Sequence, residues 1–313
     1  MYFSYLRCKQ FELLALKEIV PRLGNASLIS PVLEPVKAST SAFERAIESL
    51  VGRNMNFTII VNPVHGEFVE DSNGIFEMIN NKLTNYNNFQ IGILLHGRAN
   101  LTDINASLQL LAAPRRLTLI HADRVNNIEE LAAWREGKDI RYNLYGENFP
   151  VRRYRDIITA DTKVLLEDKF KPQEKNADYQ NVPDEFFSDD YLYYEQDGFV
   201  GFGDYLTIGD DFTTTGRLPY AIAIHLTYVR ENGEIWIRHF VSDSNTDTTD
   251  VAGKFGEALE KLIAFIDKRN IQTYAANEFR TLHKNGHYPG LGSLKKLSVM
   301  HHLELIHDLL NAR

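Results

Sequence analysis

The stretch ISPVLEPVKAST, residues 29–40, is an apolar run that passes into a polar segment without a glycine. An open, doubly wound sheet usually carries a glycine-rich phosphate-binding turn directly after its first strand. We interpret residues 29–36 as the first strand of a sheet, and the residues that follow it form no such turn. The stretch therefore argues against the doubly wound fold, which is the main alternative to a (β/α)₈ barrel.

Similar apolar runs recur along the first half of the chain, and segments with helical spacing lie between them. Continuous apolar runs suit strands that are buried on both faces, and their alternation with helices predicts a parallel sheet covered by helices. These runs are FTIIVNP (57–63), FQIGILLHG (89–97), RLTLIHAD (116–123), IRYNLYG (140–146) and KVLLEDKF (163–170). Further strands at 235–241 and 271–278 bring the count to about eight, which predicts an α/β fold of the (β/α)₈ TIM-barrel-like class.

Two segments are irregular for such a barrel. Pro31 and Pro35 lie in the first strand, and since proline cannot donate to a ladder they must lie at strand ends or at a bulge. Residues 171–219 are acidic and aromatic without a clear βα unit, and we interpret them as an insertion that forms a lid over one mouth of the barrel. A hairpin with Glu231-Asn232-Gly233 at its turn follows, before the seventh strand. We expect residues 1–313 to form a single barrel domain.

Composition limits the class of protein. The chain has 313 residues, 44% of them hydrophobic, and a formal net charge of -8. That charge argues against direct nucleic-acid binding, because a grip on the phosphate backbone needs clustered Lys and Arg. Cys8 is the only cysteine, which excludes an intramolecular disulfide and a multi-cysteine metal site. With no apolar run near the ~18–20 residues of a membrane span and no signal-peptide pattern at the N-terminus, we expect a cytoplasmic protein without a membrane partner.

Polar and ionisable residues follow nearly every predicted strand. In a (β/α)₈ barrel the loops after the strands build the active site at one face. We therefore predict catalytic residues for acid–base or metal-assisted chemistry and a set of anion-binding residues. The catalytic set is Glu34, His96, His121 and Glu167, and the anion-binding set is Lys37, Arg238 and Lys295. No His-x-His or His-Glu-x-x-His pattern is present, so no metal or other cofactor is assigned.

A structural interpretation competes with each of these assignments. Strand ends meet water, so polar residues are expected there in any case, and His96 and His121 could satisfy hydrogen bonds of the core. GLGSLKK (290–296) resembles a phosphate-cradling turn but also suits a plain loop and helix cap. HHLELIH (301–307) suggests a solvated helix surface, and GFGDYLTIGDD (201–211) suggests a glycine-rich turn in the lid.

The opening YFSYLRCKQFELLAL, the stretch ISPVLEPVK, the GFGDY segment and the ending HYPGLGSLKKLSVMHH resemble a bacterial family related to the phage beta protein. Members typically open Tyr-Phe-Pro-Tyr-Leu-Arg-Gly-Lys-Gln, and here Ser4 replaces the proline and Cys8 the glycine. The resemblance implies a barrel-like α/β fold and a place in phage or mobile-element defence loci, often beside a small companion protein. It implies no catalytic mechanism, and Cys8 puts in doubt the tight turn expected at its position.

Two functions from different classes follow. One is a component of an anti-phage or mobile-element defence locus, in which the barrel recognises a companion protein or a ligand. Its motivation is the set of aromatic side chains in the insertion, which could anchor a partner or simply pack the insertion. These are Phe186, Phe187, Tyr191, Tyr193, Tyr194, Phe199 and Phe202. The alternative is an enzyme that acts in the barrel mouth on a phosphorylated or nucleotide-like small molecule. The sequence leaves open whether the protein is an enzyme.

Overall fold

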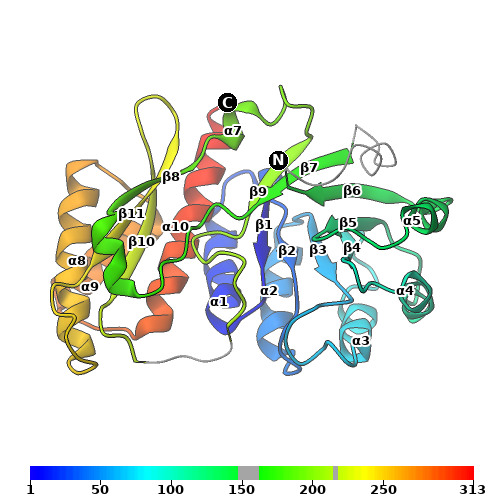
Figure 1. The fold of residues 1–313 in the computed structure, drawn as a ribbon, viewed down its shortest axis with the longest axis horizontal. Coiled ribbons are helices and arrows are strands. Elements are labelled where there is room, and N and C mark those ends of the chain that lie inside the picture. Colours follow the sequence, from blue (N-terminus) through cyan, green and yellow to red (C-terminus); the bar gives the residue numbers. More distant parts are fainter. Residues whose placement is uncertain (147–161, 214–217) are drawn as a thin grey trace. The chain divides into compact units, whose positions relative to one another are not determined.

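The computed structural model describes residues 1–146, 162–213 and 218–313. Eight parallel strands close into a barrel with interleaved helices (Figure 1), so the predicted (β/α)₈ TIM-barrel-like class is confirmed. In barrel order the strands are β1 (Tyr2–Leu6), β2 (Val32–Leu33), β3 (Phe57–Ile60), β4 (Phe89–Leu95), β5 (Leu117–His121), β6 (Ile140–Tyr145), β7 (Lys163–Glu167) and β9 (Gly201–Asp204). The barrel closes where β9 pairs with both β7 and β1.

The helices between these strands bury one apolar face each. In α2, for example, Phe43, Ala46, Ile47 and Leu50 are buried, which is the spacing of one helix face. Asparagine side chains begin two of the helices, since Asn100 accepts from the backbone of α4 and Asn127 from that of α5. The bounds are α1 (Gln10–Ile19), η1 (Val20–Arg22), η2 (Ala26–Leu28), α2 (Ser41–Gly52), α3 (Asn73–Lys82), α4 (Leu101–Leu108) and α5 (Ile128–Arg135).

The strand expected at 29–36 is shorter than predicted and is not the first. β2 covers only Val32 and Leu33, with Pro31 and Pro35 just outside it, as the prolines required. The N-terminal strand β1 precedes it, pairs with it in parallel, and is buried along its whole length. The apolar N-terminal stretch YFSYL therefore supplies a barrel strand that we did not predict.

The GFGD segment, expected as a turn in a lid, forms the last barrel strand, β9. Its glycines are required by close packing against β1. A Cβ on Gly201 would lie 2.7 Å from Cε2 of Phe3, and one on Gly203 would overlap the Phe3 backbone. Glycine is usually depleted in strands, which is why the composition of this segment pointed to a turn. Part of the predicted 171–219 insertion is thus barrel, and the lid assignment is corrected to that extent.

The chain divides into two compact units, where we expected one barrel domain over 1–313. The first, the barrel unit, comprises Met1–Glu167 and Leu192–Asp204, and the second unit comprises Asp168–Tyr191 and Tyr205–Arg313. The short helix α7 (Asp190–Tyr193) crosses the boundary between them. The second unit begins inside the segment that we interpreted as an insertion, so the chain leaves the barrel before β9 and again after it.

The second unit has its own antiparallel sheet, in the order β10-β11-β8. Two strand predictions are corrected here: the hairpin β10–β11 belongs to this sheet and not to the barrel, and 271–278 begins a helix. Thr273 caps that helix by accepting from the backbone N–H of Ala276. The elements are η4 (Asn176–Asn181), β8 (Asp184–Ser188), β10 (Ala223–Val229), β11 (Ile235–Val241), α8 (Val251–Lys268), α9 (Tyr274–Asn285) and α10 (Leu291–Asn311).

Helix α10 packs on β10 (Figure 1). It carries histidines into the core, where we expected a solvated surface. His301 and His302 are fully buried and His307 nearly so. Thr227 of β10 contacts His301 and His302. Its carbonyl oxygen lies 2.7 Å from Nε2 of His301, and its Oγ1 lies 3.0 Å from Nδ1 of His302. Because these hydrogen bonds satisfy the rings, the histidines are tolerated in the interior.

Candidate active site at the barrel mouth

Contacts between non-adjacent strands show which residues face the barrel interior. Oγ1 of Thr58 in β3 lies 3.3 Å from Oγ1 of Thr118 in β5, and β4 between them presents Gly92 at that level. Phe3 of β1 meets Tyr142 of β6 in the same way. Because side chains alternate along a strand, the register then assigns every other residue to the interior.

Glu34 faces the interior at the C-terminal end of β2. Val32 is in register with Tyr5 and with Thr58, and Glu34 lies two residues further on the same face. Its side chain is 1% exposed. Glu34 therefore lies at the C-terminal end of the parallel strands, the end at which (β/α)₈ barrels carry their active sites.

Donors from the ends of the two neighbouring strands, β1 and β3, surround the Glu34 carboxylate. Tyr5 donates its hydroxyl to Oε2 at 3.0 Å, and the Val64 backbone N–H donates to Oε1 at 3.1 Å. Nε of Arg7 lies 3.5 Å from Oε2, and Nδ1 of His65 lies 3.4 Å from Oε1. A buried carboxylate is stable only when it is paired and hydrogen-bonded, and this arrangement supplies both.

Burial and nearby charges shift the pKa values of two residues beside this cluster, Cys8 and Glu12. Burial raises the pKa of the Cys8 thiol well above its usual value, and the carboxylates of Glu12 and Glu34 raise it further. Burial also raises the pKa of Glu12 to about 6, although Lys9 and Arg7 oppose the shift.

The tight turn expected at Cys8 is present, since its φ is 50°, in the left-handed region that favours glycine.

His65 is the member of the cluster that meets solvent. Its side chain is 31% exposed, against 1% for Glu34. When Nδ1 carries a proton it can donate to Glu34, which fixes the ring and leaves Nε2 on the opposite side as the basic nitrogen. A buried carboxylate that orients a half-exposed imidazole is an arrangement suited to proton transfer.

The other predicted catalytic residues do not gather around Glu34. His96 follows β4, and the alternation of that strand assigns it to the face that points into the barrel. Its Nδ1 accepts a hydrogen bond from the Arg98 backbone N–H at 3.2 Å. Burial lowers the pKa of His96, and Arg98 lowers it further, while Asp123 opposes the shift. His96 thus shares the end of the barrel with Glu34, but no contact joins the two among the residues described.

The alternation of β5 and β7 assigns His121 and Glu167 to the faces of their strands that point away from the barrel interior. His121 is buried with its Nε2 3.2 Å from Oδ1 of Asn143, and burial lowers its pKa to about 4. Glu167 ends β7 in register with Asp204. For His121 the buried contact with Asn143 agrees with the structural interpretation, in which the ring satisfies a hydrogen bond of the core.

The predicted anion-binding residues are spread over both units. Lys37 is exposed and pairs with Glu67 at 2.7 Å. Arg238 lies in β11 of the second unit, where it pairs with Asp184 at 2.5 Å. Lys295 is exposed on α10 of the second unit. They do not form one site within either unit.

Sequence reasoning missed Tyr5 and Arg7, because it did not recognise β1 as a strand. The alternating aromatic residues of YFSYL were the available signal. His65 follows the strand predicted at 57–63, but the sequence analysis assigned it no role. Its pairing with Glu34 depends on the parallel register of β2 and β3, which the sequence does not reveal.

The aromatic side chains expected to anchor a partner are mostly in the core. Phe186 is 38% exposed and Tyr193 is 46% exposed. Phe199 is partly buried. The others are buried, namely Phe187, Tyr191, Tyr194 and Phe202. Most of these rings therefore stabilise the fold.

Comparisons with known proteins add no relative: no family model, no curated protein and no solved structure matches the chain. Within residues 1–146, 162–213 and 218–313, no group of three or more His, Cys, Asp or Glu side chains is placed to hold a metal ion. Among the helices described, none combines the length and apolar character that a bilayer span requires.

Proposed function

We propose that the barrel unit is an enzyme in which Glu34 and His65 act as a carboxylate–imidazole pair for proton transfer at the barrel mouth. The observation that carries the proposal is the 3.4 Å approach of His65 Nδ1 to a carboxylate that is itself buried at a strand end. His65 would accept a proton from a substrate hydroxyl or from water, and Glu34 would stabilise the imidazolium that forms.

The surroundings of Glu34 support this role by holding the carboxylate still. The Tyr5 hydroxyl and the Val64 N–H occupy one oxygen each, so the orientation of the carboxylate is set before substrate binds. Preorganised polar groups of this kind need little rearrangement during a reaction. Arg7, nearly as buried as Glu34, balances its charge.

The substrate class expected from the sequence, a phosphorylated small molecule, gains no support at the barrel mouth. Arg7 is ion-paired with Glu34, and Lys37 is ion-paired with Glu67. A phosphate-binding site normally offers cations or backbone N–H groups to the ligand. The proposal therefore specifies proton-transfer chemistry and assigns phosphate recognition no place at Glu34.

The test combines activity with the state of the His65 ring. The purified chain is screened for hydrolysis and isomerisation of a mixed panel of esters, phosphoesters and sugars. We expect His65→Asn to lower any activity found by about 10²–10⁴-fold, the usual contribution of a general base. In ¹⁵N NMR spectra we expect neutral His65 to carry its proton on Nδ1, and Glu34→Gln to abolish that preference.

His283→Asn provides the control, because His283 is exposed on α9 of the second unit. It should leave both activity and the His65 spectrum unchanged. Equal activity of the wild type and His65→Asn, or a neutral His65 protonated on Nε2, would refute the proposal. Circular dichroism of each variant separates loss of function from loss of fold.

The resemblance to the beta protein family supports a second candidate, a component of a defence locus that recognises a companion protein. The exposed rings of Phe186 and Tyr193 favour it. Deleting 183–203 would remove β8 and β9 and so unfold the protein, which makes Phe186→Ser and Tyr193→Ser the better variants. Native mass spectrometry of the chain co-expressed with its genomic neighbour should show a complex that these variants weaken, and a chain that stays alone would rule this candidate out.

A further inference from the structure

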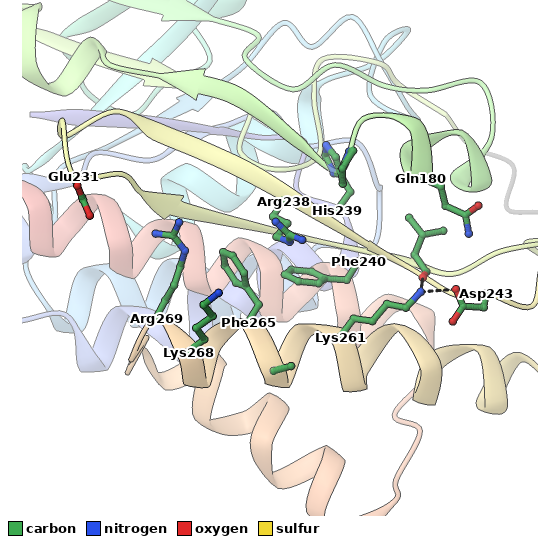
Figure 2. Close-up of a pocket in the computed structure, with 13 residues that line it drawn as sticks. Gln180, Glu231, Arg238, His239, Phe240, Asp243, Lys261, Phe265, Lys268 and Arg269 are labelled. Atoms are coloured by element: carbon green, nitrogen blue, oxygen red, sulfur yellow. Dashed lines mark hydrogen bonds and ion pairs between the residues drawn. The ribbon is translucent and has the colours of Figure 1, made fainter.

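A cleft lies within the second unit between β11 and α8, remote in sequence from the residues around Glu34. Its volume is about 790 Å³, within the range of about 300–1,000 Å³ that is typical of small-molecule sites. Figure 2 shows the side chains of Phe265 and Lys268 in α8, and of Arg269 just after it, directed toward the hairpin that carries Arg238 and Phe240. The cleft is large enough for a nucleotide.

The cations of the cleft fall into two kinds. Lys261 is neutralised by Asp243 at 2.7 Å, and Arg238 is neutralised by Asp184. In the part of the chain that the structure describes, no carboxylate pairs with Lys268 or Arg269, although both line the cleft. The cleft therefore carries uncompensated positive charge in a protein whose formal net charge is -8.

Aromatic rings hold the arginines in place. The Cζ atom of Arg269 lies 4.3 Å from the ring centre of Tyr228 and 5.2 Å from that of Phe265. On β11, the Cζ atom of Arg238 lies 5.0 Å from the ring centre of Phe265. A guanidinium held on an aromatic face keeps its N–H groups in a fixed planar fork, the geometry that suits a phosphate.

A smaller cavity of about 310 Å³ extends the cleft past the hairpin turn and shares Glu231 and Arg269 with it. Its other lining residues are Arg230 and Asn232. The Glu231 carboxylate can accept hydrogen bonds from sugar hydroxyls but repels a phosphate, whereas the Asn232 amide can bind either group. Along this hollow, Glu231 is followed by Arg269 and Lys268, and these by the rings of Phe265 and Phe240 (Figure 2).

We propose that this cleft binds a phosphorylated small molecule of nucleotide size, with Lys268 and Arg269 as the residues that hold its phosphate. Arg269 would supply the fork and Lys268 a mobile point charge. The aromatic floor of Phe240 and Phe265 would cover the less polar part of the ligand on one side of the phosphate, and the Glu231 end would accept hydroxyls of a sugar attached on the other side. This proposal is independent of the chemistry proposed for Glu34 and His65.

A structural role alone does not account for the arrangement. Lys268 lies in the last turn of α8, where a cation stabilises the helix through its dipole. That role needs neither a cavity nor a ring-stacked arginine beside it. A solvated helix end also gives no reason for Arg269 to lie over two rings at the wall of a cleft.

Binding is measured by calorimetry with the full chain and defined probes: ADP, GDP, CDP, UDP, pyrophosphate, adenosine and a 12-nucleotide single-stranded DNA. We expect at least one nucleoside diphosphate to bind more tightly than pyrophosphate and adenosine do. Lys268→Ala should weaken that binding about tenfold or more, because a hydrogen bond to a charged group is worth ~1.5–3 kcal/mol. Arg269→Lys should weaken it as well, since it removes the fork.

Lys284→Ala is the matched control, because it removes an exposed lysine from α9, outside the cleft. It should bind like the wild type, and so should His65→Asn, which separates this test from that of the barrel mouth. Absence of binding by every probe, or equal affinities of Lys268→Ala and Lys284→Ala, would overturn the proposal. Tighter binding of the DNA than of any nucleotide would overturn the assignment to a small molecule.

Discussion

The two units differ in whether the charges of their ionisable side chains are paired. At the barrel mouth Glu34, fully buried, is matched by Arg7 and His65. The second unit instead buries several neutral histidines on one side of its hairpin, while on the other side no carboxylate among the described residues pairs with Lys268 or Arg269. Paired charges keep a site preorganised, whereas unpaired cations are available to a ligand. The difference suggests catalysis in the barrel unit and anion binding in the second.

Acidification should distinguish the units most strongly. Burial lowers the pKa of His239 and of His301 from the usual 6.5 to about 4, and it lowers that of His225 well below its usual value. The unfolded chain takes up protons near pH 6.5 and the folded unit does so only near pH 4. The free energy of unfolding therefore falls as pH drops through that window, by about 2 kcal/mol for each of His239 and His301 between pH 7 and pH 5.

The barrel unit should resist the same change better. Burial lowers the pKa of His121 to about 4, but it raises that of Glu12 to about 6, so the folded barrel takes up a proton that stabilises it as pH falls. Glu185, whose pKa burial also raises, offsets only part of the loss in the second unit.

Single-tryptophan variants report the units separately. The chain has two tryptophans, Trp134 in the barrel unit and Trp236 in the second. In urea at pH 5 the fluorescence of Trp236, followed in Trp134→Phe, should change at lower denaturant than that of Trp134, followed in Trp236→Phe. Coincident transitions at pH 5, or an earlier change of Trp134, would contradict the comparison.

Removing the central carboxylate should have the next largest effect, and only on the barrel unit. Glu34→Ala removes the carboxylate that pairs with the buried guanidinium of Arg7, and breaking a buried pair costs about 3–5 kcal/mol. Equilibrium denaturation followed by Trp134 measures the loss. Lys37→Ala breaks an exposed pair with Glu67 and should cost less than about 1 kcal/mol. Similar losses for the two variants would mean that the Glu34 cluster is not stabilised by pairing.

The smallest expected effect concerns the turn after β1. Cys8 is buried with φ of 50°, where a side chain costs about 1 kcal/mol relative to glycine. Both Cys8→Gly and Cys8→Ala lose the thiol, but only glycine relieves the backbone. Thermal denaturation should therefore find Cys8→Gly more stable than Cys8→Ala by about 1 kcal/mol, and the reverse order would show that the turn is unstrained.

Much of the architecture could be predicted from local patterns. The runs at 57–63, 89–97 and 116–123 contain strands, and helices lie between them as the alternation predicted. These predictions are confirmed because burial on both faces and helical spacing depend on neighbouring residues. The predictions failed where contacts with residues distant in the sequence determine whether a side chain is buried. His301 and His302 are placed in the core by Thr227, on a strand far away in the sequence.

Local sequence thus determined the barrel class, the alternation of strands and helices, and Glu34 as a strand-end carboxylate. Only the tertiary structure decided that GFGD closes the barrel, because Phe3 packs so closely against this strand that a Cβ at Gly201 or Gly203 would clash with it. It also decided which residues meet at Glu34, since three parallel strands must be in register before Tyr5, Arg7 and His65 converge. The cleft of the second unit is of the same kind, because the rings that hold Arg269 come from two elements that are separate in the sequence, Tyr228 from β10 and Phe265 from α8.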